Sequence, residues 1–193
     1  MLFEPLKKRI EEQGESLGGG ILNVDPFINH QVDPVLMDQC GRALADLFKA
    51  THPTKVLTAE ISGIAPALMA AKYLDVPVVY ARKHKPVTMP DTVYLTVAPS
   101  DTKGRMVELI VSPEYLGVNE RVLIIDDFLA SGSTIAGLAR LTQTAGATLV
   151  GIGTLIEKTF ESGRELLSSY NVPIEALVAI ASLDHGQIIF AQD

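Results

Sequence analysis

The feature that most constrains this chain is a continuous apolar run at residues 122–125 that ends in two consecutive acidic residues, Asp126 and Asp127. A run without polar alternation is typical of a central strand in a parallel sheet, which is buried on both faces. Small residues follow at 130–134, and residues 133–145 have helical periodicity. Parallel strands must be joined by crossover connections, which are usually helices. The segment therefore predicts an α/β fold.

The same alternation of strands and helices recurs on both sides of this segment. We expect strands at residues 55–59, 76–80, 121–126, 149–156 and 174–180, and helices near residues 33–50, 65–74, 133–145 and 163–169. Residues 93–97 and 106–111 are instead two β-rich runs flanking residues 100–104, which predicts an inserted antiparallel hairpin. Residues 176–183 and 187–190 predict a closing hairpin. The predicted fold class is α/β, with a mainly parallel twisted sheet flanked by helices and an inserted β-hairpin.

A separate segment precedes this alternation. Residues 4–14 predict an amphipathic helix, which Gly14 ends. Asp33 and Pro34 are a typical cap and first turn for the next helix. The apolar residues of that helix are at positions 35, 36, 40, 44, 47 and 48. Because no repeat, low-complexity tract or linker interrupts the chain, residues 1–193 are interpreted as a single domain.

Composition limits the partners of the chain. Its 193 residues carry a formal net charge of −7, which opposes attraction to nucleic acid or to anionic membranes. No apolar run approaches the roughly 18 residues of a membrane-spanning helix. The single cysteine, Cys40, cannot form an internal disulfide and is interpreted as a core residue. Residues 1–13 are too charged for a secretory signal. We therefore expect a cytoplasmic protein without nucleic-acid or membrane partners.

The end of the apolar run carries the residues best suited to chemistry. Consecutive strand side chains point to opposite faces, so Asp126 and Asp127 can meet two different groups, such as a sugar diol and a hydrated cation. The small residues at 130–134 bring backbone N–H groups and hydroxyls to a helix N-terminus, where they form a site for phosphate. In this order, the two features predict a site for a sugar phosphate.

Simpler interpretations apply to each feature alone. A lone acidic pair is more often a helix cap or a solvated pair, and a lone Ser/Gly loop is usually a turn. The pattern also resembles the strand that precedes the metal site of nucleotide hydrolases. That alternative requires a Gly-Lys-Ser/Thr loop for the triphosphate, which the sequence lacks.

Residues 122–134 resemble the phosphoribosyl pyrophosphate signature of the type I phosphoribosyltransferases. The segments at residues 24–30, 60–66, 81–85 and 156–160 are similar to those of the bacterial xanthine phosphoribosyltransferases within that family, and the similarity runs nearly end to end. The resemblance implies purine salvage, in which xanthine and phosphoribosyl pyrophosphate give xanthosine monophosphate and pyrophosphate. It also implies a homodimer and a magnesium ion held mainly by the substrate.

The resemblance also assigns site residues. Asp126 and Asp127 are the expected catalytic residues. The residues expected to bind phosphoribosyl pyrophosphate are Ala130, Ser131, Gly132, Ser133, Thr134, Ser62, Gly63 and Lys83, and those expected to bind xanthine are Leu22, Asn29 and Lys158. Residues 1–32 would form an N-terminal base-recognition segment, and residues 83–111 a flexible hood.

Elementary chemistry supports several of these assignments. Gly63 lacks a side chain, which would permit close backbone approach to an anion. The cations at Lys83 and its neighbours would offset charge on departing pyrophosphate. The Lys158 ammonium is a donor only, which suits the exocyclic oxygens of an oxopurine and disfavours the amine of adenine. Phe128 or Phe160 is a candidate for stacking on the base.

Two other functions stay open. Hypoxanthine or guanine could replace xanthine, because all three bases have an oxygen at position six and the sequence does not show what meets position two. A non-catalytic purine-sensing regulator on the same fold is the second alternative, although the acidic balance disfavours RNA binding. The four histidines lack the spacing of metal ligands, so we expect no metal site made by the protein alone.

Overall fold

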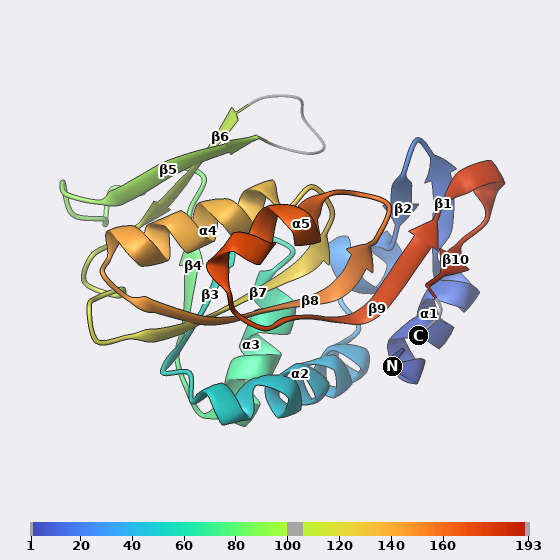
Figure 1. Cartoon of the computed structure of the whole chain (residues 1–193), viewed down its shortest axis with the longest axis horizontal. Helices are drawn as coiled ribbons and strands as arrows, with labels where there is room; N and C mark the ends of the chain where they lie inside the picture. Colours follow the sequence, from blue (N-terminus) through green and yellow to red (C-terminus); the bar gives the residue numbers. More distant parts are fainter. Residues whose placement is uncertain (1, 100–105, 192–193) are drawn as a thin grey trace.

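The computed structural model describes residues 2–99 and 106–191, and its centre is a sheet in the order β10-β9-β8-β7-β3-β4 (Figure 1). The strands are β3 (Lys55–Ala59), β4 (Val78–Ala81), β7 (Arg121–Leu129), β8 (Thr148–Lys158), β9 (Ile174–Ser182) and β10 (Ile189–Phe190). Every neighbouring pair is parallel except β9 with β10, which is antiparallel. The predicted mainly parallel sheet and the closing hairpin are confirmed.

Helices cover both faces of this sheet. α2 (Pro34–Phe48) and α3 (Ile64–Leu74) lie on one face, and α4 (Ser133–Thr144) and α5 (Gly163–Leu167) lie on the other (Figure 1). Along β7, Leu123 and Ile125 belong to the core beneath α2 and α3, whereas Val122 and Ile124 belong to the core beneath α4. Because strand side chains alternate between faces, a strand covered on both sides must be apolar at every position.

The capping of α2 is as predicted, but its apolar face is narrower. The Asp33 carboxylate accepts hydrogen bonds from the backbone N–H groups of Val35 (2.9 Å) and Leu36 (3.0 Å). Val35 and Leu47, which we expected on the apolar face, are exposed, and Met37 is buried instead. The two exposed residues are apolar but lie outside the stripe of the helix that meets the sheet. The apolar spacing predicts the helix, and packing selects the face.

The segment before α2 docks beside β9. It consists of α1 (Glu4–Gln13), β1 (Glu15–Gly18), β2 (Ile21–Asn23) and a π-helical turn at Asp25–Asn29. Three one-turn 3-10 helices lie in other parts of the chain, at Lys49–Thr51, Ser168–Tyr170 and Asp184–Gly186. The predicted first helix is confirmed, with Leu6 and Ile10 buried. The Phe3 N–H donates to the Leu177 carbonyl (2.8 Å), and the Ser16 hydroxyl donates to the Leu183 carbonyl (2.7 Å). These bonds attach the N-terminal segment to β9 and to the residue that follows it.

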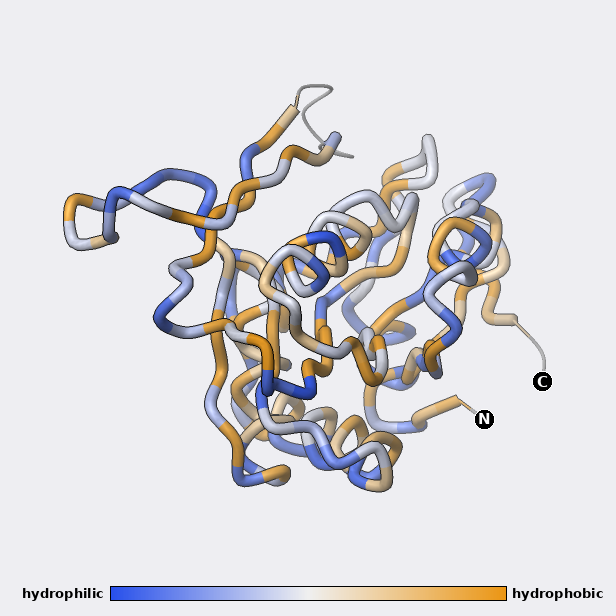
Figure 2. The backbone as a smooth tube through the Cα atoms, turned by 60° about the vertical axis from the view of Figure 1, so that its left-hand side comes forward, coloured by the Kyte–Doolittle hydropathy of each residue, from blue (hydrophilic) through white to orange (hydrophobic). Residues whose placement is uncertain are grey.

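The predicted inserted hairpin is confirmed as β5 (Tyr94–Pro99) paired antiparallel with β6 (Met106–Val111). The expected connection at residues 100–104 lies outside the described residues. The hairpin forms a sheet of its own that projects from the body of the fold near α4 (Figures 1 and 2). Two backbone hydrogen bonds between Arg82 and Ile110 (2.8 and 2.9 Å) attach it to the end of β4. None of the helices in residues 2–99 and 106–191 has the length and apolar character to cross a membrane.

Candidate active site

A pocket of about 940 Å³ lies at the carboxyl ends of β7, β8 and β9, between the β1–β2 turn and the β5–β6 hairpin. Ligands of open α/β sheets bind at this edge. The predicted site residues that line it are Leu22, Asn29, Ser62, Lys83, Asp126, Asp127, Ala130, Gly132, Ser133, Thr134 and Lys158. Ser131 and Gly63 do not line it. The tertiary structure therefore brings together residues separated by more than a hundred positions in the chain.

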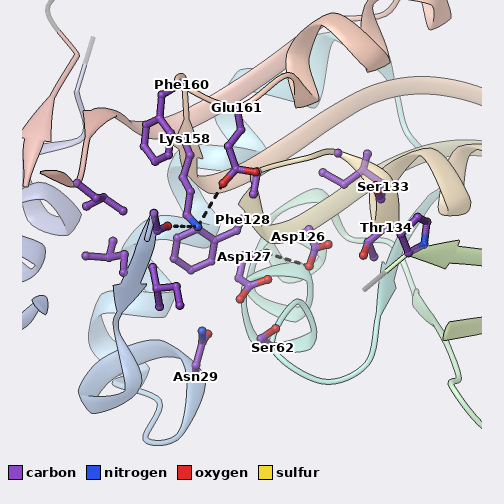
Figure 3. Close-up of a pocket in the computed structure, with 18 of the residues that line it drawn as sticks. Asn29, Ser62, Asp126, Asp127, Phe128, Ser133, Thr134, Lys158, Phe160 and Glu161 are labelled. Atoms are coloured by element: carbon purple, nitrogen blue, oxygen red, sulfur yellow. Dashed lines mark hydrogen bonds and ion pairs between the residues drawn. The ribbon is translucent and has the colours of Figure 1, made fainter. Parts of the chain in front are cut away.

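The two carboxylates lie inside β7, because the strand continues to Leu129 and not, as expected, to Asp126 alone. Both are nearly buried, with 7% of Asp126 and 9% of Asp127 exposed, and both face the pocket. Figure 3 shows Asp126 on the side of Thr134, and Asp127 on the side of Asn29. The two acidic groups therefore face different ends of one pocket.

Burial changes the chemistry of Asp126. Loss of water around the carboxyl group, followed by the adjacent negative charge of Asp127, raises the pKa of Asp126 well above its ordinary value, while the more distant charge of Lys83 acts in the opposite direction. The Asp126 carboxylate also accepts a hydrogen bond from the Asp127 backbone N–H (3.0 Å). A cationic or hydroxyl-rich ligand would relieve this repulsion.

The small-residue loop leads into the N-terminus of α4. Gly132 has φ of 77°, a left-handed conformation that glycine adopts without strain. The Ser131 hydroxyl donates to the Ser133 hydroxyl (2.9 Å) and accepts from the Ser133 backbone N–H (3.2 Å). These two hydrogen bonds within residues 131–133 help to shape the loop before α4. The helix N-terminus itself is open to the pocket at Ser133 and Thr134 and favours an anion there.

Gly63 is held in place by close packing within the protein. The residue is buried with φ of −68°, so its backbone needs no special freedom. A Cβ atom at this position would lie 2.5 Å from Asp126 Oδ1 and closer still to Thr58 Oγ1. The close packing of β7 against the turn after β3 is thus a reason for glycine at this position that the sequence did not indicate. Ser62, the preceding residue, is the one that lines the pocket.

The basic segment after β4 divides into residues with different partners. Arg82 pairs with Glu60 (Nε to Oε2, 2.9 Å), and Lys85 pairs with Asp91 (Nζ to Oδ1, 3.8 Å). The Lys83 backbone N–H donates to the same Glu60 carboxylate (2.7 Å), and its side chain lines the pocket. Within residues 2–99 and 106–191, Lys83 has no ion-pair partner. Lys83 is therefore the cation of this segment that a bound anion would meet.

The opposite end of the pocket is built around Lys158. Its ammonium donates to the Gly20 carbonyl (2.7 Å), lies 3.5 Å from Glu161 Oε1, and lies 5.6 Å from the centre of the Phe128 ring. Figure 3 shows these groups together, with Phe160 beyond Lys158 and Asn29 across the pocket. Donors, an acceptor and aromatic rings thus line this end, which can bind a flat polar ring.

Sequence reasoning missed several lining residues. They are residues 19–21 at the β1–β2 turn, Glu161, and residues 181–184 at the end of β9 and just beyond it. A sequence signal for Glu161 was available, because its negative charge lies three residues after the positive charge of Lys158. The turn gave no such signal, because Gly20 contributes its backbone carbonyl. In the described part of the chain, no group of three or more His, Cys, Asp or Glu residues could hold a metal ion.

Comparisons with known proteins agree with this geometry. The family model of the phosphoribosyl transferase domain matches residues 32–175. The xanthine phosphoribosyltransferase of Levilactobacillus brevis is 47% identical over 188 residues, covering 97% of this chain and 98% of that protein. The one from Deinococcus deserti is 51% identical over 177 residues, covering 92% of each.

Solved structures share the fold. An adenine phosphoribosyltransferase from Rhodothermus marinus superposes with a TM-score of 0.73 and 25% identity, covering 92% of this chain and 99% of that one. Sequence similarity over nearly the full length and the shared fold lead to one conclusion. This chain belongs to the phosphoribosyltransferase family and, within it, to the xanthine phosphoribosyltransferases.

Proposed function

We propose that the protein transfers ribose phosphate from phosphoribosyl pyrophosphate to xanthine, giving xanthosine monophosphate and pyrophosphate. The observation that carries the proposal is the order of groups along one pocket. The N-terminus of α4 lies at one end, the carboxylates of Asp126 and Asp127 in the middle, and Lys158 at the other end (Figure 3). Phosphate, ribose and base fit these groups in that order.

In the proposed reaction, a ring nitrogen of the base forms a bond to C1 of the ribose. The bond from C1 to pyrophosphate breaks, the electron pair leaves with pyrophosphate, and the base loses a proton to solvent. Asp126 and Asp127 orient the ribose hydroxyls and stabilise the positive charge that develops on the sugar, while Lys83 offsets negative charge on the pyrophosphate. The protein acts by positioning and electrostatics, without a covalent intermediate.

The residues fit a magnesium ion that the substrate mainly holds. Carboxylate oxygens are suitable ligands for magnesium, and Asp126 and Asp127 present them at the pocket wall. Two carboxylate groups are too few to surround a magnesium ion, so substrate and water would supply most of its ligands. When bound, magnesium would neutralise charge on the pyrophosphate. Lys83 and the α4 N-terminus would still hold their own parts of the substrate.

Lys158 supports an oxopurine over adenine. Its ammonium can only donate, so it pairs with an exocyclic oxygen and repels the donor amine of adenine. Hypoxanthine and guanine share the oxygen at position six.

The deciding experiment measures pyrophosphate release with adenine, guanine, hypoxanthine and xanthine, using Asp126→Asn/Asp127→Asn as the inactive control. Highest kcat/KM with xanthine supports the proposal, and preference for adenine contradicts it. Failure to turn over any base would favour the purine-sensing regulator.

We also propose that residues 83–111 form a hood over the phosphoribosyl pyrophosphate, with residues 1–32 recognising the base in a single domain of 1–193. Support comes from pocket-lining residues of β5 and β6, which are Ala98, Pro99, Val107 and Leu109. Limited proteolysis of the hairpin with and without substrate tests this role, and equal cleavage contradicts it.

The proposed assembly is a homodimer in the cytoplasm. The outer face of the hairpin exposes Leu95, Val97 and Met106, which a second copy could cover. Light scattering after size-exclusion chromatography tests the dimer, and a monomeric mass rejects it. The lone buried thiol of Cys40 agrees with a reducing compartment, and cell fractionation tests that location.

A further inference from the structure

The Lys158 ammonium is held by the protein before any base is present. Its side chain is 14% exposed, and two oxygen acceptors are close to it, the Gly20 carbonyl at 2.7 Å and Glu161 Oε1 at 3.5 Å. Gly20 belongs to the β1–β2 turn, whereas Glu161 follows β8 in the same loop as Phe160. The ammonium is therefore clamped between two segments that lie far apart in the sequence.

This clamp limits what Lys158 can offer to a ligand. A lysine ammonium has three N–H donors; the Gly20 carbonyl accepts one of them, and the ion pair with Glu161 at 3.5 Å attracts a second. One donor is left for the pocket, and the Phe128 ring, 5.6 Å away, supports the charge from another side. A lysine stem is flexible, so the two acceptors are what give this remaining donor a direction.

We propose that Glu161 is a positioning residue for base selection, which acts by holding the Lys158 ammonium so that a single N–H points at an exocyclic oxygen of the base. The inference rests on the proposed function. Glu161 lines the pocket, and its side chain is 30% exposed, so it is accessible from the base end. Figure 3 shows its carboxylate beside the Lys158 ammonium, to which a dashed line joins it. Its effect should therefore be confined to the base.

The first test compares Glu161→Gln, which removes the charge, with Glu161→Asp, which keeps it on a shorter stem. We expect the KM for xanthine to rise about tenfold in Glu161→Gln, because a charge-assisted partner of the donor is lost. The kcat and the KM for phosphoribosyl pyrophosphate should change less than about twofold, which is roughly the error with which the effects of independent mutations add. Glu161→Asp should recover part of the loss.

A matched control is Glu165→Gln, the same change four residues later on an exposed helical position that does not line the pocket. It should leave all kinetic constants unaltered. Thermal unfolding of each variant checks the fold. If the KM for xanthine rises equally in Glu165→Gln, the effect is not specific to Glu161 and the inference fails.

A double-mutant cycle separates positioning from direct contact. If Glu161 acts through Lys158, Glu161→Gln should add nothing to the KM of Lys158→Gln. A further rise in KM in that background would overturn the inference, as would an unchanged KM in Glu161→Gln alone. Both results presuppose that the wild-type protein turns over an oxopurine. Wild-type preference for adenine would instead refute the proposed function, so the two failures are distinguishable.

Discussion

Replacing Gly63 by alanine should displace the Asp126 carboxylate and lower the activity. The added Cβ would lie 2.5 Å from Asp126 Oδ1 and nearer still to Thr58 Oγ1. Carbon and oxygen atoms pack at about 3.5 Å, so the carboxylate or the turn must move by about 1 Å. Since Asp126 lies on a strand buried on both faces, the turn and the carboxylate share this displacement.

The expected loss follows from that displacement. A shift of about 1 Å at a catalytic group can lower the rate about 100-fold, so about 100-fold, or about 2.7 kcal/mol of transition-state stabilisation, is the upper limit for a displacement that the turn shares. Overpacking should also lower the free energy of unfolding by about 1–3 kcal/mol. The assay is pyrophosphate release from phosphoribosyl pyrophosphate and xanthine, with urea unfolding measured on the same preparation.

Gly117→Ala is the matched control. A Cβ at Gly117 would meet no atom within 4 Å, so this variant should keep full activity, with stability unchanged or slightly raised because the unfolded chain loses freedom. Wild-type activity in folded Gly63→Ala would refute the argument that Gly63 makes room for Asp126. Equal losses in both variants would refute it as well.

The remaining predictions concern other buried groups. Because Asp126 has a raised pKa in the folded state, its neutral form is favoured there, and stability falls as pH rises from about 4 through the raised value. In urea unfolding, Asp126→Asn should therefore be more stable than wild type at pH 7, and this gain should shrink toward pH 4. Its activity should fall at least about 100-fold. A difference in stability between variant and wild type that is the same at pH 4 and pH 7 would contradict the raised pKa. Burial raises the pKa of the Cys40 thiol to about 12, so Ellman's reagent should react with it only in denaturant, and rapid reaction of the native protein would contradict its burial. The Arg164 fork donates to both carboxylate oxygens of buried Glu157 (2.7 and 2.6 Å), so Arg164→Lys should cost about 2 kcal/mol in chemical unfolding; a loss under about 0.5 kcal/mol would show that the fork contributes little.

Local pattern was enough to predict most elements of this fold. The apolar run before Asp126, the cap at Asp33 and the β-rich runs of the hairpin depend on interactions within a few residues, which sequence periodicity reports directly. The strand and helix order then restricts the sheet to a mainly parallel one. The acidic pair and the helix N-terminus were also predictable, because strand, loop and helix are consecutive in the chain.

The other half of the site could not be predicted in this way. The Gly20 carbonyl that accepts a hydrogen bond from Lys158 is 138 residues away in the chain. Because it is a backbone group, the pattern of side chains in the sequence does not indicate it. Likewise, the close packing of Gly63 against Asp126 depends on how β3 and β7 pair, and not on the turn itself. Sequence by itself predicted most of the elements and a sugar-phosphate site near Asp126. Only the tertiary structure decided how Lys158 is held and why residue 63 must be glycine, because both depend on contacts between segments that meet only after the sheet has formed.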